Sequence, residues 1–328
     1  MKIAIAFVAC VACIALFAVS QGSTSSLFQQ KNWGVEQSFM RFIAENKKSY
    51  QNRAEYEKRL QAFSDFLDRI EAQRAFNPEG EYGITQFADW TEEEFIALQT
   101  RFPAEDDLGD YVFEQSNAAD VDWRTKNNGK YLSAVKNQGA CGSCWAFSAV
   151  AAAESATRMA NVDTEVYSEQ QVVDCFTNGC SGCSGGFTYL AFGYIDKAGQ
   201  ELEFERNYKY TARQSSCKYQ KGLGKDLKTS YDVVKPNNLG DALQKGPVSV
   251  AVWASDWSGY NGGVHKCSRK INSKYELNHE VQAVGKTQNS WIIKNSWGNR
   301  WGQKGFIEVS NDRQYDCGTT LDAYFLHY

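Results

Sequence analysis

Residues 138–145 read Gln-Gly-Ala-Cys-Gly-Ser-Cys-Trp, a run of small residues that ends in a cysteine and a tryptophan. Small side chains allow the backbone of such a loop to approach a ligand closely. From Cys144 to Ala160 the sequence is rich in alanine and free of glycine and proline, which predicts a buried helix. Unpaired N–H groups at a helix start favour a thiolate. Cys144 is therefore a candidate nucleophile, although a cysteine considered alone is more often a structural or disulfide residue.

A cysteine nucleophile also needs a base, and the chain has three histidines. His279 lies in Leu-Asn-His-Glu-Val (277–281), with apolar residues 283–285 after it, as in a strand that enters the core. The alternative is a buried histidine with a purely structural role. His265 and His327 have no comparable context. Asn295 lies in Lys-Asn-Ser-Trp-Gly (294–298), and an amide that accepts from an imidazole N–H fixes the tautomer of the ring.

The pattern Cys-Gly-Ser-Cys-Trp (141–145) resembles the sequence around the catalytic cysteine of papain and the cathepsins. In that family the partner histidine and asparagine lie some 130–150 residues downstream. Here they follow Cys144 by 135 and 151 residues. The resemblance to the papain/cathepsin L family implies an α+β, papain-like two-domain fold. A helical domain and a β-barrel-like domain flank a catalytic cleft in that fold, and a helical inhibitory propeptide precedes them.

The same resemblance implies a set of catalytic roles. Cys144 is the nucleophile, His279 is the base, and Asn295 is the amide that orients the base. Trp297 shields the contact between the imidazole and the amide from water. Gln138 matches the side chain that forms the oxyanion hole together with the backbone N–H of Cys144.

The resemblance also implies a substrate cleft lined by Gly185, Gly186, Thr188, Ala251, Glu280, Trp297 and Asp322. Gly185-Gly186 matches the strip that hydrogen-bonds an extended substrate. Asp322 matches the floor of the pocket for the side chain two residues before the scissile bond, and Glu280 is expected at its rim. An acidic floor is associated with tolerance of arginine. The alternative is that Asp322 points to solvent and that the pocket is apolar.

Eight of the ten cysteines lie after residue 140, and the oxidising route that an N-terminal secretory signal implies would allow them to form disulfides. By resemblance the disulfides are Cys141–Cys183, Cys175–Cys217 and Cys267–Cys317. Cys180 is then left as a free thiol. Its C-x-x-C spacing to Cys183 also fits half of a zinc site, but no second ligand pair at a suitable spacing follows. Neither a metal nor another cofactor is expected.

The first 20 residues are typical of a secretory signal peptide. Lys2 precedes an apolar run from Ile3 to Val19, and small residues follow at 18–20. A membrane anchor is the alternative, but the run is short and no basic cluster follows it. Residues 21–118 are expected to form the propeptide and residues 119–328 the peptidase domain.

The propeptide should contain one long helix from Phe39 to Arg74, where charged residues surround Leu60, Phe63, Leu67 and Ile70 at steps of three and four. A short helix should begin at Thr91, because Thr-Glu-Glu-Glu (91–94) fits a capping box. Residues 103–119 are acidic and aperiodic, and they are expected to form an exposed linker. The long helix resembles the inhibitory propeptide of the family, with Phe66 and Arg74 where asparagine is usual and Thr85 replacing an asparagine downstream.

The charge distribution bears on the partners. Residues 1–118 carry 11 basic and 18 acidic residues, whereas residues 119–328 carry 24 and 21. No basic stripe suits a phosphate backbone, so nucleic acid is excluded as an expected partner. The acidic propeptide complements the basic peptidase half, so protonation of carboxylates should weaken their contact. The expected partners are protein and peptide substrates and the propeptide itself, with no membrane contact after signal removal and a monomeric enzyme.

The sequence therefore predicts a cysteine endopeptidase that is made as a zymogen and is secreted or delivered to a lysosomal, endosomal or granule lumen. No loop with paired histidines lies between Cys175 and Cys217, which argues against a carboxydipeptidase. No Asn-x-Ser/Thr sequence occurs, which removes an N-linked handle for glycan-dependent sorting. A catalytically silent binding protein of the same fold is the main alternative, and it would show a replaced nucleophile, base or Gln138. An isolated inhibitor module would end near residue 118.

Overall fold

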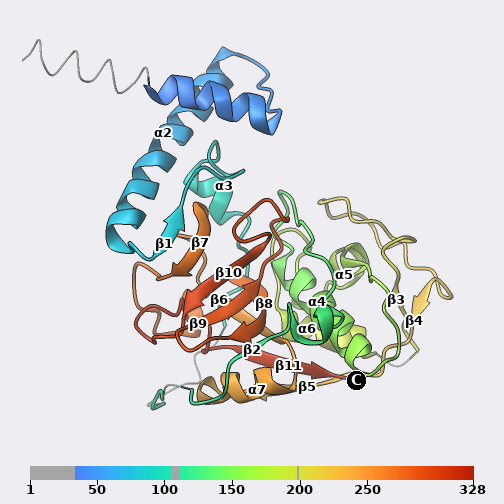
Figure 1. Ribbon diagram of the computed structural model, residues 1–328. Coiled ribbons are helices and arrows are strands. Elements are labelled where there is room, and N and C mark those ends of the chain that lie inside the picture. The colour runs from blue at the N-terminus through green and yellow to red at the C-terminus, as the bar shows by residue number, and fades with distance from the viewer. Residues whose placement is uncertain (1–33, 105–110, 115, 198) are drawn as a thin grey trace, which may run out of the picture. The chain divides into compact units, whose positions relative to one another are not determined.

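The computed structural model describes residues 34–104, 111–114, 116–197 and 199–328, and it divides at residue 65 into two compact units (Figure 1). The predicted signal peptide lies outside the described residues. Among the described residues, no helix is both long and apolar enough to cross a bilayer. The division between the units falls within a helix of the predicted propeptide.

The first unit contains a helix at residues 34–46 and the beginning of α2 Arg53–Phe76. The prediction of one helix over 39–74 is therefore wrong, because residues 47–52 interrupt it. Lys47 has a left-handed φ of 51°, which ends the first helix, and Asn52 Oδ1 accepts a 2.9 Å bond from the N–H of Glu55 at the start of the second. The interruption allows Phe39 to pack on Phe63 at 5.2 Å between ring centres.

The second unit, Phe66–Tyr328, contains the remaining regular structure. Its helices after α2 are α3 Glu92–Ile96, α4 Cys144–Met159, α5 Glu169–Cys175, α6 Thr188–Ile195 and α7 Leu239–Lys245, with 3-10 turns at Lys126–Gly129, Pro236–Asn238 and Lys274–Glu276. Its strands are β1 Gly80–Tyr82, β2 Val121–Asp122, β3 Leu202–Glu203, β4 Gly224–Lys225, β5 Ser230–Val234, β6 Val248–Val252, β7 Tyr260–His265, β8 His279–Lys286, β9 Ser290–Lys294, β10 Phe306–Ser310 and β11 Ala323–His327.

A helical layer surrounds α4, drawn in green in Figure 1. The predicted buried helix is confirmed, and its small residues allow α5 and α6 to pack closely around it. The core of this layer includes Trp145, Ala149, Val172 and Phe192. α4 also lies against β8, where Ser148 Oγ donates to Val281 O at 2.9 Å.

The β layer, orange and red in Figure 1, is a sheet in the order β1-β7-β10-β9-β8-β6-β11-β5, with β2 beside β8. The strands predicted at 248–252 and 291–293 are present, buried as their β-branched side chains indicate. The sheet is open rather than a closed barrel. In the antiparallel pair β8–β9, Gln282 lies opposite Lys294, so the start of β8 lies beside the residue that follows β9. This register brings His279 and Asn295 together.

The segment predicted to be the propeptide continues the sheet and then begins a short helix. β1 pairs antiparallel with β7, and Gly83 N donates to Gly259 O at 2.8 Å. Thr85 replaces the expected asparagine, and its hydroxyl donates to Ser258 O at 2.6 Å. Thr91 caps α3 with the predicted capping box, completed by Glu94.

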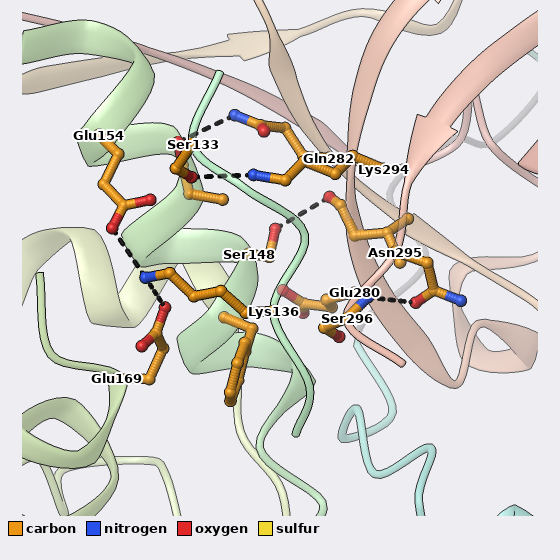
Figure 2. Close-up of a pocket in the computed structure, with 13 residues that line it drawn as sticks. Ser133, Lys136, Ser148, Glu154, Glu169, Glu280, Gln282, Lys294, Asn295 and Ser296 are labelled. Atoms are coloured by element: carbon orange, nitrogen blue, oxygen red, sulfur yellow. Dashed lines mark hydrogen bonds and ion pairs between the residues drawn. The ribbon is translucent and has the colours of Figure 1, made fainter. Parts of the chain in front are cut away.

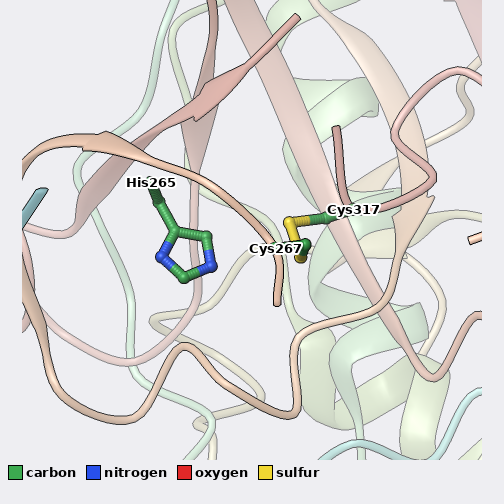
Figure 3. Close-up of side chains that lie close together, drawn as sticks. All are labelled: His265, Cys267 and Cys317. Atoms are coloured by element: carbon green, nitrogen blue, oxygen red, sulfur yellow. A yellow bond between two sulfur atoms is a disulfide. The ribbon is translucent and has the colours of Figure 1, made fainter. Parts of the chain in front are cut away.

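Three disulfides join Cys141 to Cys183, Cys175 to Cys217 and Cys267 to Cys317, the pairs that the family resemblance implies. Cys180 is a buried free thiol. His265 lies close to the Cys267–Cys317 pair (Figure 3), but these sulfur atoms are bonded to each other and are not thiolate ligands for a metal. Each bridge closes a loop of about 40–50 residues and so restricts the unfolded chain.

Candidate active site

Cys144 is the first residue of α4 and is fully buried. The loop before it is held by the Cys141–Cys183 disulfide and by Gly142 N, which donates to Cys183 O at 3.0 Å. Burial raises the pKa of the Cys144 thiol to about 12, and the Glu280 carboxylate adds to this effect. Backbone N–H groups, including that of Trp145, act in the opposite direction. In this state the sulfur is therefore a thiol at neutral pH.

His279 Nε2 lies 2.9 Å from Asn295 Oδ1, so the ring donates to the amide oxygen and its Nδ1 carries the lone pair. Nδ1 is buried without a hydrogen-bond partner. Burial lowers the pKa of His279 to about 4, although the Asn295 bond opposes this effect. The Trp297 ring stacks on His279 at 4.9 Å between ring centres and is itself fully buried. The arrangement holds one tautomer of a neutral imidazole away from water.

Gln138 holds a peptide carbonyl of the propeptide. Its Nε2 donates to Leu98 O at 3.0 Å and to Cys141 O at 3.0 Å, while its Oε1 accepts from Ser296 Oγ at 2.7 Å. The Ser296 bond fixes the orientation of the amide, so that its N–H groups point toward the carbonyl oxygens. Gln138 is fully buried. The side chain expected in an oxyanion hole therefore already binds a carbonyl oxygen of this chain.

The glycine strip binds the next propeptide residues. Gly186 N donates to Thr100 O at 3.3 Å, and Phe102 N donates to Gly186 O at 3.5 Å. A Cβ at Gly185 would lie 2.1 Å from Thr100 O, and one at Gly186 would lie 2.6 Å from Cys180 Sγ. Side chains are therefore excluded at both positions by close contacts. Residues 98–102, in the predicted propeptide, lie along the glycine strip that the resemblance assigns to an extended substrate.

The propeptide also covers the aromatic shield of the site. Phe87 and Phe95 each pack edge-on against Trp297, with ring centres 5.3 Å apart. Gln86 Nε2 donates to Trp297 O at 2.8 Å. These three residues therefore shield Trp297, the ring that stacks on His279, from solvent.

The four residues expected around the side-chain pocket lie together. Thr188 N donates to Glu280 Oε2 at 2.8 Å, Ala251 pairs with Glu280 between β6 and β8, and Ala251 N donates to Asp322 O at 2.9 Å. Asp322 is buried and does not point to solvent. Glu280, expected at the rim, is buried in this structure, and its carboxylate faces the backbone of Thr188 and the guanidinium of Arg101.

Sequence reasoning missed a buried ionic cluster beside Asn295 (Figure 2). Lys136 Nζ lies 2.7 Å from Glu154 Oε1 and also binds Glu169, and Lys294 Nζ donates to Ser133 Oγ at 2.9 Å. Burial raises the pKa of Glu169 to about 7, and burial lowers the pKa of Lys294 to about 8. The cluster joins α4 and α5 to Lys294, the last residue of β9, which directly precedes Asn295. Four charged residues far apart in sequence carry no local pattern that could have predicted it.

Removal of one charge from this cluster should destabilise the protein strongly. Glu154→Gln leaves two buried lysines, Lys136 and Lys294, with Glu169 as their one remaining carboxylate, so we expect a loss of about 3–5 kcal/mol in the free energy of unfolding. Denaturant unfolding of the precursor, carrying Cys144→Ala to prevent self-cleavage, measures this loss. The matched control is Glu165→Gln, which removes a half-exposed pair with Arg206 and should cost at most about 1 kcal/mol. Equal losses in the two variants would contradict the prediction.

Comparison with known proteins agrees with this geometry. A family model described as "Papain family cysteine protease" matches residues 117–326, and one described as "Cathepsin propeptide inhibitor domain (I29)" matches residues 39–95. "Cysteine proteinase 1" of Zea mays is 34% identical over 323 residues, which covers 87% of this chain and 84% of that relative.

Solved precursor structures are also similar to this chain. Procathepsin L 3 of the Tenebrio molitor larval midgut has a TM-score of 0.77 at 32% identity, covering 90% of this chain and 99% of that one. The recombinant stem bromelain precursor has a TM-score of 0.74 at 31% identity, again covering 90% and 99%. With the family model matching more than half of its length, the chain belongs to the papain family of cysteine proteases and is a zymogen with a cathepsin-type propeptide inhibitor domain.

Proposed function

We propose that Cys144, His279 and Asn295 hydrolyse peptide bonds through an acyl-enzyme. His279 takes the thiol proton while the sulfur of Cys144 attacks the carbonyl carbon, and the carbonyl oxygen becomes an oxyanion. Gln138 Nε2 and the Cys144 backbone N–H stabilise that oxyanion. His279 gives the proton to the leaving amine, which departs. A water molecule, deprotonated by His279, then attacks the thioester, releases the carboxylic acid and restores the thiol.

The observation that carries this proposal is the 3.0 Å bond from Gln138 Nε2 to the Leu98 carbonyl oxygen. Gln138 Nε2, the donor proposed for the oxyanion, therefore already donates to a peptide carbonyl oxygen. Nδ1 of His279 has no hydrogen-bond partner, so its lone pair can accept the thiol proton. The bond to Asn295 keeps the existing ring proton on Nε2 and so leaves this lone pair on Nδ1.

Acid-treated precursor, assayed on a library of fluorogenic peptides with its new N-terminus sequenced, tests the proposal. Hydrolysis after loss of the propeptide supports the enzyme and also locates the boundary proposed near residue 118. Tight binding of peptides without any cleavage would instead favour the alternative of a catalytically silent binding protein.

We also propose that the enzyme is an endopeptidase. The segment 175–217 has no histidine that would bind the carboxylate of a substrate C-terminus. Peptides blocked at both ends should therefore be cut internally. Release of C-terminal dipeptides in preference to internal cleavage would contradict this assignment.

The domain organisation and location belong to the same proposal. Residues 1–20 are removed as a signal peptide, residues 21–118 are the propeptide, and residues 119–328 act as a monomeric enzyme. Three disulfides support an oxidising route, either to secretion or to a lysosomal, endosomal or granule lumen. Sequencing of the secreted or lumenal protein and its elution volume in gel filtration test these assignments.

Loss of the orienting amide should impair catalysis less than loss of the nucleophile. Asn295→Ala removes the acceptor for His279 Nε2 but leaves thiol and imidazole in place, so the fall in kcat should be about two orders of magnitude smaller than that for Cys144→Ala. Steady-state kinetics on one peptide measure both. Asn295→Asp, which retains an acceptor, is the matched control and should be closer to the unmodified enzyme. Equal losses for Asn295→Ala and Cys144→Ala would contradict the orienting role.

A further inference from the structure

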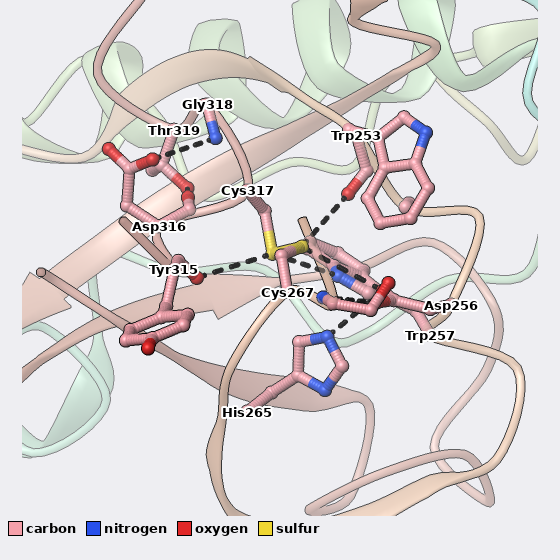
Figure 4. Close-up of a disulfide and its surroundings, with 12 residues drawn as sticks. Trp253, Asp256, Trp257, His265, Cys267, Tyr315, Asp316, Cys317, Gly318 and Thr319 are labelled. Atoms are coloured by element: carbon pink, nitrogen blue, oxygen red, sulfur yellow. Dashed lines mark hydrogen bonds and ion pairs between the residues drawn. A yellow bond between two sulfur atoms is a disulfide. The ribbon is translucent and has the colours of Figure 1, made fainter. Parts of the chain in front are cut away.

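His265, the last residue of β7, is buried, and its two ring nitrogens face different halves of the zymogen. Nε2 lies 3.0 Å from Asp256 Oδ1 of the peptidase half (Figure 4), and Nδ1 lies 3.0 Å from Tyr82 Oη of the propeptide. Tyr82 ends β1, the propeptide strand that pairs with β7. His265 therefore links this propeptide strand to a carboxylate of the peptidase.

The hydrogen bonds at this contact run in one direction. Asn77 Nδ2 donates to Tyr82 Oη at 2.9 Å and to Val264 O at 2.8 Å. Because a backbone carbonyl only accepts, the Val264 bond fixes the nitrogen of the Asn77 amide toward Tyr82. The Tyr82 hydroxyl then donates to His265 Nδ1, and His265 Nε2 donates to Asp256. This order requires a neutral imidazole whose one proton is on Nε2.

The oxygen of Tyr82 already faces two donors. Burial raises the pKa of Tyr82 to about 12, so the hydroxyl keeps its own proton at neutral and acidic pH. The backbone N–H of Lys266 points toward the same oxygen as the Asn77 amide does. A second proton on the His265 ring would place a third donor, Nδ1–H, against this oxygen. The Tyr82 proton would then have lost its acceptor in a buried site, which costs free energy.

The amide oxygen of Asn77 does not supply a replacement acceptor. It is buried and has no hydrogen-bond partner of its own. Rotation of the amide to offer this oxygen to Tyr82 would bring it against Val264 O, so that two acceptors would face each other. The rotation would also break the two bonds that Asn77 Nδ2 makes. A protonated His265 therefore leaves the contact with at least one unmade hydrogen bond.

The other charged and titratable groups around the contact are engaged elsewhere. They are Arg74, which donates to the backbone oxygen of Tyr82, Lys266 and Glu79, which pair at 2.9 Å, Tyr260, which donates to Gly263 O, and Glu308 of β10, which accepts from Ser290. The neighbouring Cys267 and Cys317 form a disulfide and do not titrate. Asp256 belongs to the peptidase half, so it faces the ring both before and after release of the propeptide. The Tyr82 contact is what distinguishes the two states.

The two strands lie too close for Tyr82 to turn away. A Cβ at Gly80 would lie 2.7 Å from Asn77 Nδ2 and 2.7 Å from the Tyr82 hydroxyl oxygen. Gly263 of β7 has a left-handed φ of 68°, and a Cβ there would lie 2.3 Å from a backbone oxygen of the propeptide. Just beyond the strand, Gly83 N donates to a β7-side carbonyl at 2.8 Å. A lost hydrogen bond at Tyr82 therefore weakens the strand pair itself.

We propose that His265 is an acid-sensitive latch, in which protonation of the ring weakens the hold of β1 on β7 and so favours release of the propeptide. In the released enzyme, water takes the place of the Tyr82 hydroxyl and accepts from Nδ1–H. A protonated ring thus costs a hydrogen bond in the zymogen but not in the released enzyme, so acid favours release. Histidine side chains as a class change charge between pH 5 and 8, above the range of carboxylates.

Hydrogen exchange in precursor that carries Cys144→Ala, and so cannot cleave itself, tests the latch without catalysis. Exchange of the backbone N–H groups of residues 80–83, corrected for the intrinsic effect of pH, should become at least about tenfold faster between pH 7 and pH 5. His265→Gln keeps a donor and an acceptor but cannot be protonated, so its corrected exchange should change less than about threefold. The matched control is His327→Gln, a half-exposed histidine near the C-terminus, which should behave like the unmodified precursor. An undiminished acid effect in His265→Gln overturns the proposal.

Tyr82→Phe provides a second arm that leaves the histidine in place. It removes the hydroxyl that favours a neutral ring in the zymogen, so residues 80–83 should exchange faster at pH 7 and should change less than about threefold on acidification to pH 5. If Tyr82→Phe instead retains the tenfold change, the contact between Tyr82 and His265 is not the latch.

The self-cleaving precursor gives the functional readout. His265→Gln should lower the pH of half-maximal activation rate by at least about half a unit, because release then depends on groups that are protonated only in stronger acid. An activation profile identical to that of the unmodified precursor would overturn the latch as a determinant of activation. Failure of every precursor to activate, with the expected hydrogen exchange intact, would instead contradict the peptidase function and leave the latch supported.

Discussion

Cys144→Ala should abolish peptide hydrolysis, with a loss in kcat on the order of 10⁶-fold, as found when the nucleophile of a catalytic triad is removed. The physical reason is that neither Gln138 nor His279 can form the acyl bond. The buried position of Cys144 at the start of α4 is compatible with alanine, so the variant should fold with unchanged stability. Initial rates on a fluorogenic peptide, after removal of the propeptide by an added protease, measure the loss.

A thiol-directed epoxide reagent gives an independent readout. The activated enzyme should be labelled once, at Cys144, and the Cys144→Ala variant should not be labelled. Cys180→Ala is the matched control, because it removes the other free buried thiol and should leave labelling intact. Full activity of Cys144→Ala, or labelling that follows Cys180, would contradict the assignment of the nucleophile.

The intact precursor should be inactive at neutral pH and should lose its propeptide when the pH falls toward 4–5, near the ordinary carboxylate pKa of about 4. The carboxylates of Asp322 and Glu79 pair with Arg101 and Lys266 across the contact between propeptide and enzyme. An ion pair loses its attraction when its carboxylate is protonated, so acid favours release of the propeptide. The burial that raises the pKa of the Cys144 thiol is relieved at the same time.

Two measurements follow activation. Gel electrophoresis with N-terminal sequencing should show loss of the chain up to about residue 118, and alkylation of Cys144 at pH 7 should be slow before release and fast after it. High salt should ease activation through the exposed Glu79–Lys266 pair more than through the buried Arg101 pocket. Full activity of uncleaved precursor at pH 7 would contradict the inhibitory role of the propeptide.

The parts of this protein that were predictable from sequence are those set by local chemistry. The capping box at Thr91, the helix that begins at Cys144 and the apolar strands depend on neighbours a few residues away. The helix break at 47–52 was missed because the packing that it allows, Phe39 on Phe63, joins residues 24 positions apart. The apolar residues of the second helix recur at helical spacing, and the prediction carried this helix back across residues 47–52. Tertiary contacts rather than local sequence determine where a helix of this kind ends.

The missed parts of the site have the same origin. The inward turn of Glu280 depends on Arg101, nearly 180 residues earlier in the chain, and on the backbone of Thr188. The Lys136 cluster joins two helices and a strand that no local pattern connects. The net charges of the two halves suggested that acidic residues of the propeptide pair with basic residues of the enzyme. In the buried pairs the charges are reversed, because the cation Arg101 comes from the propeptide half and the carboxylates Glu280 and Asp322 come from the enzyme half.

The segment 98–102 occupies the cleft of the chain to which it is covalently joined, so its binding is a unimolecular equilibrium. A short tether holds a ligand at an effective concentration on the order of millimolar, whatever the dilution of the protein. While the chain is intact, dilution cannot release the cleft. One cut between the cleft segment and residue 119 turns the propeptide into a separate molecule, and its occupancy then falls as the solution is diluted. A precursor leaving a crowded compartment would therefore remain silent until that first cut, and afterwards dilution alone would favour the active enzyme.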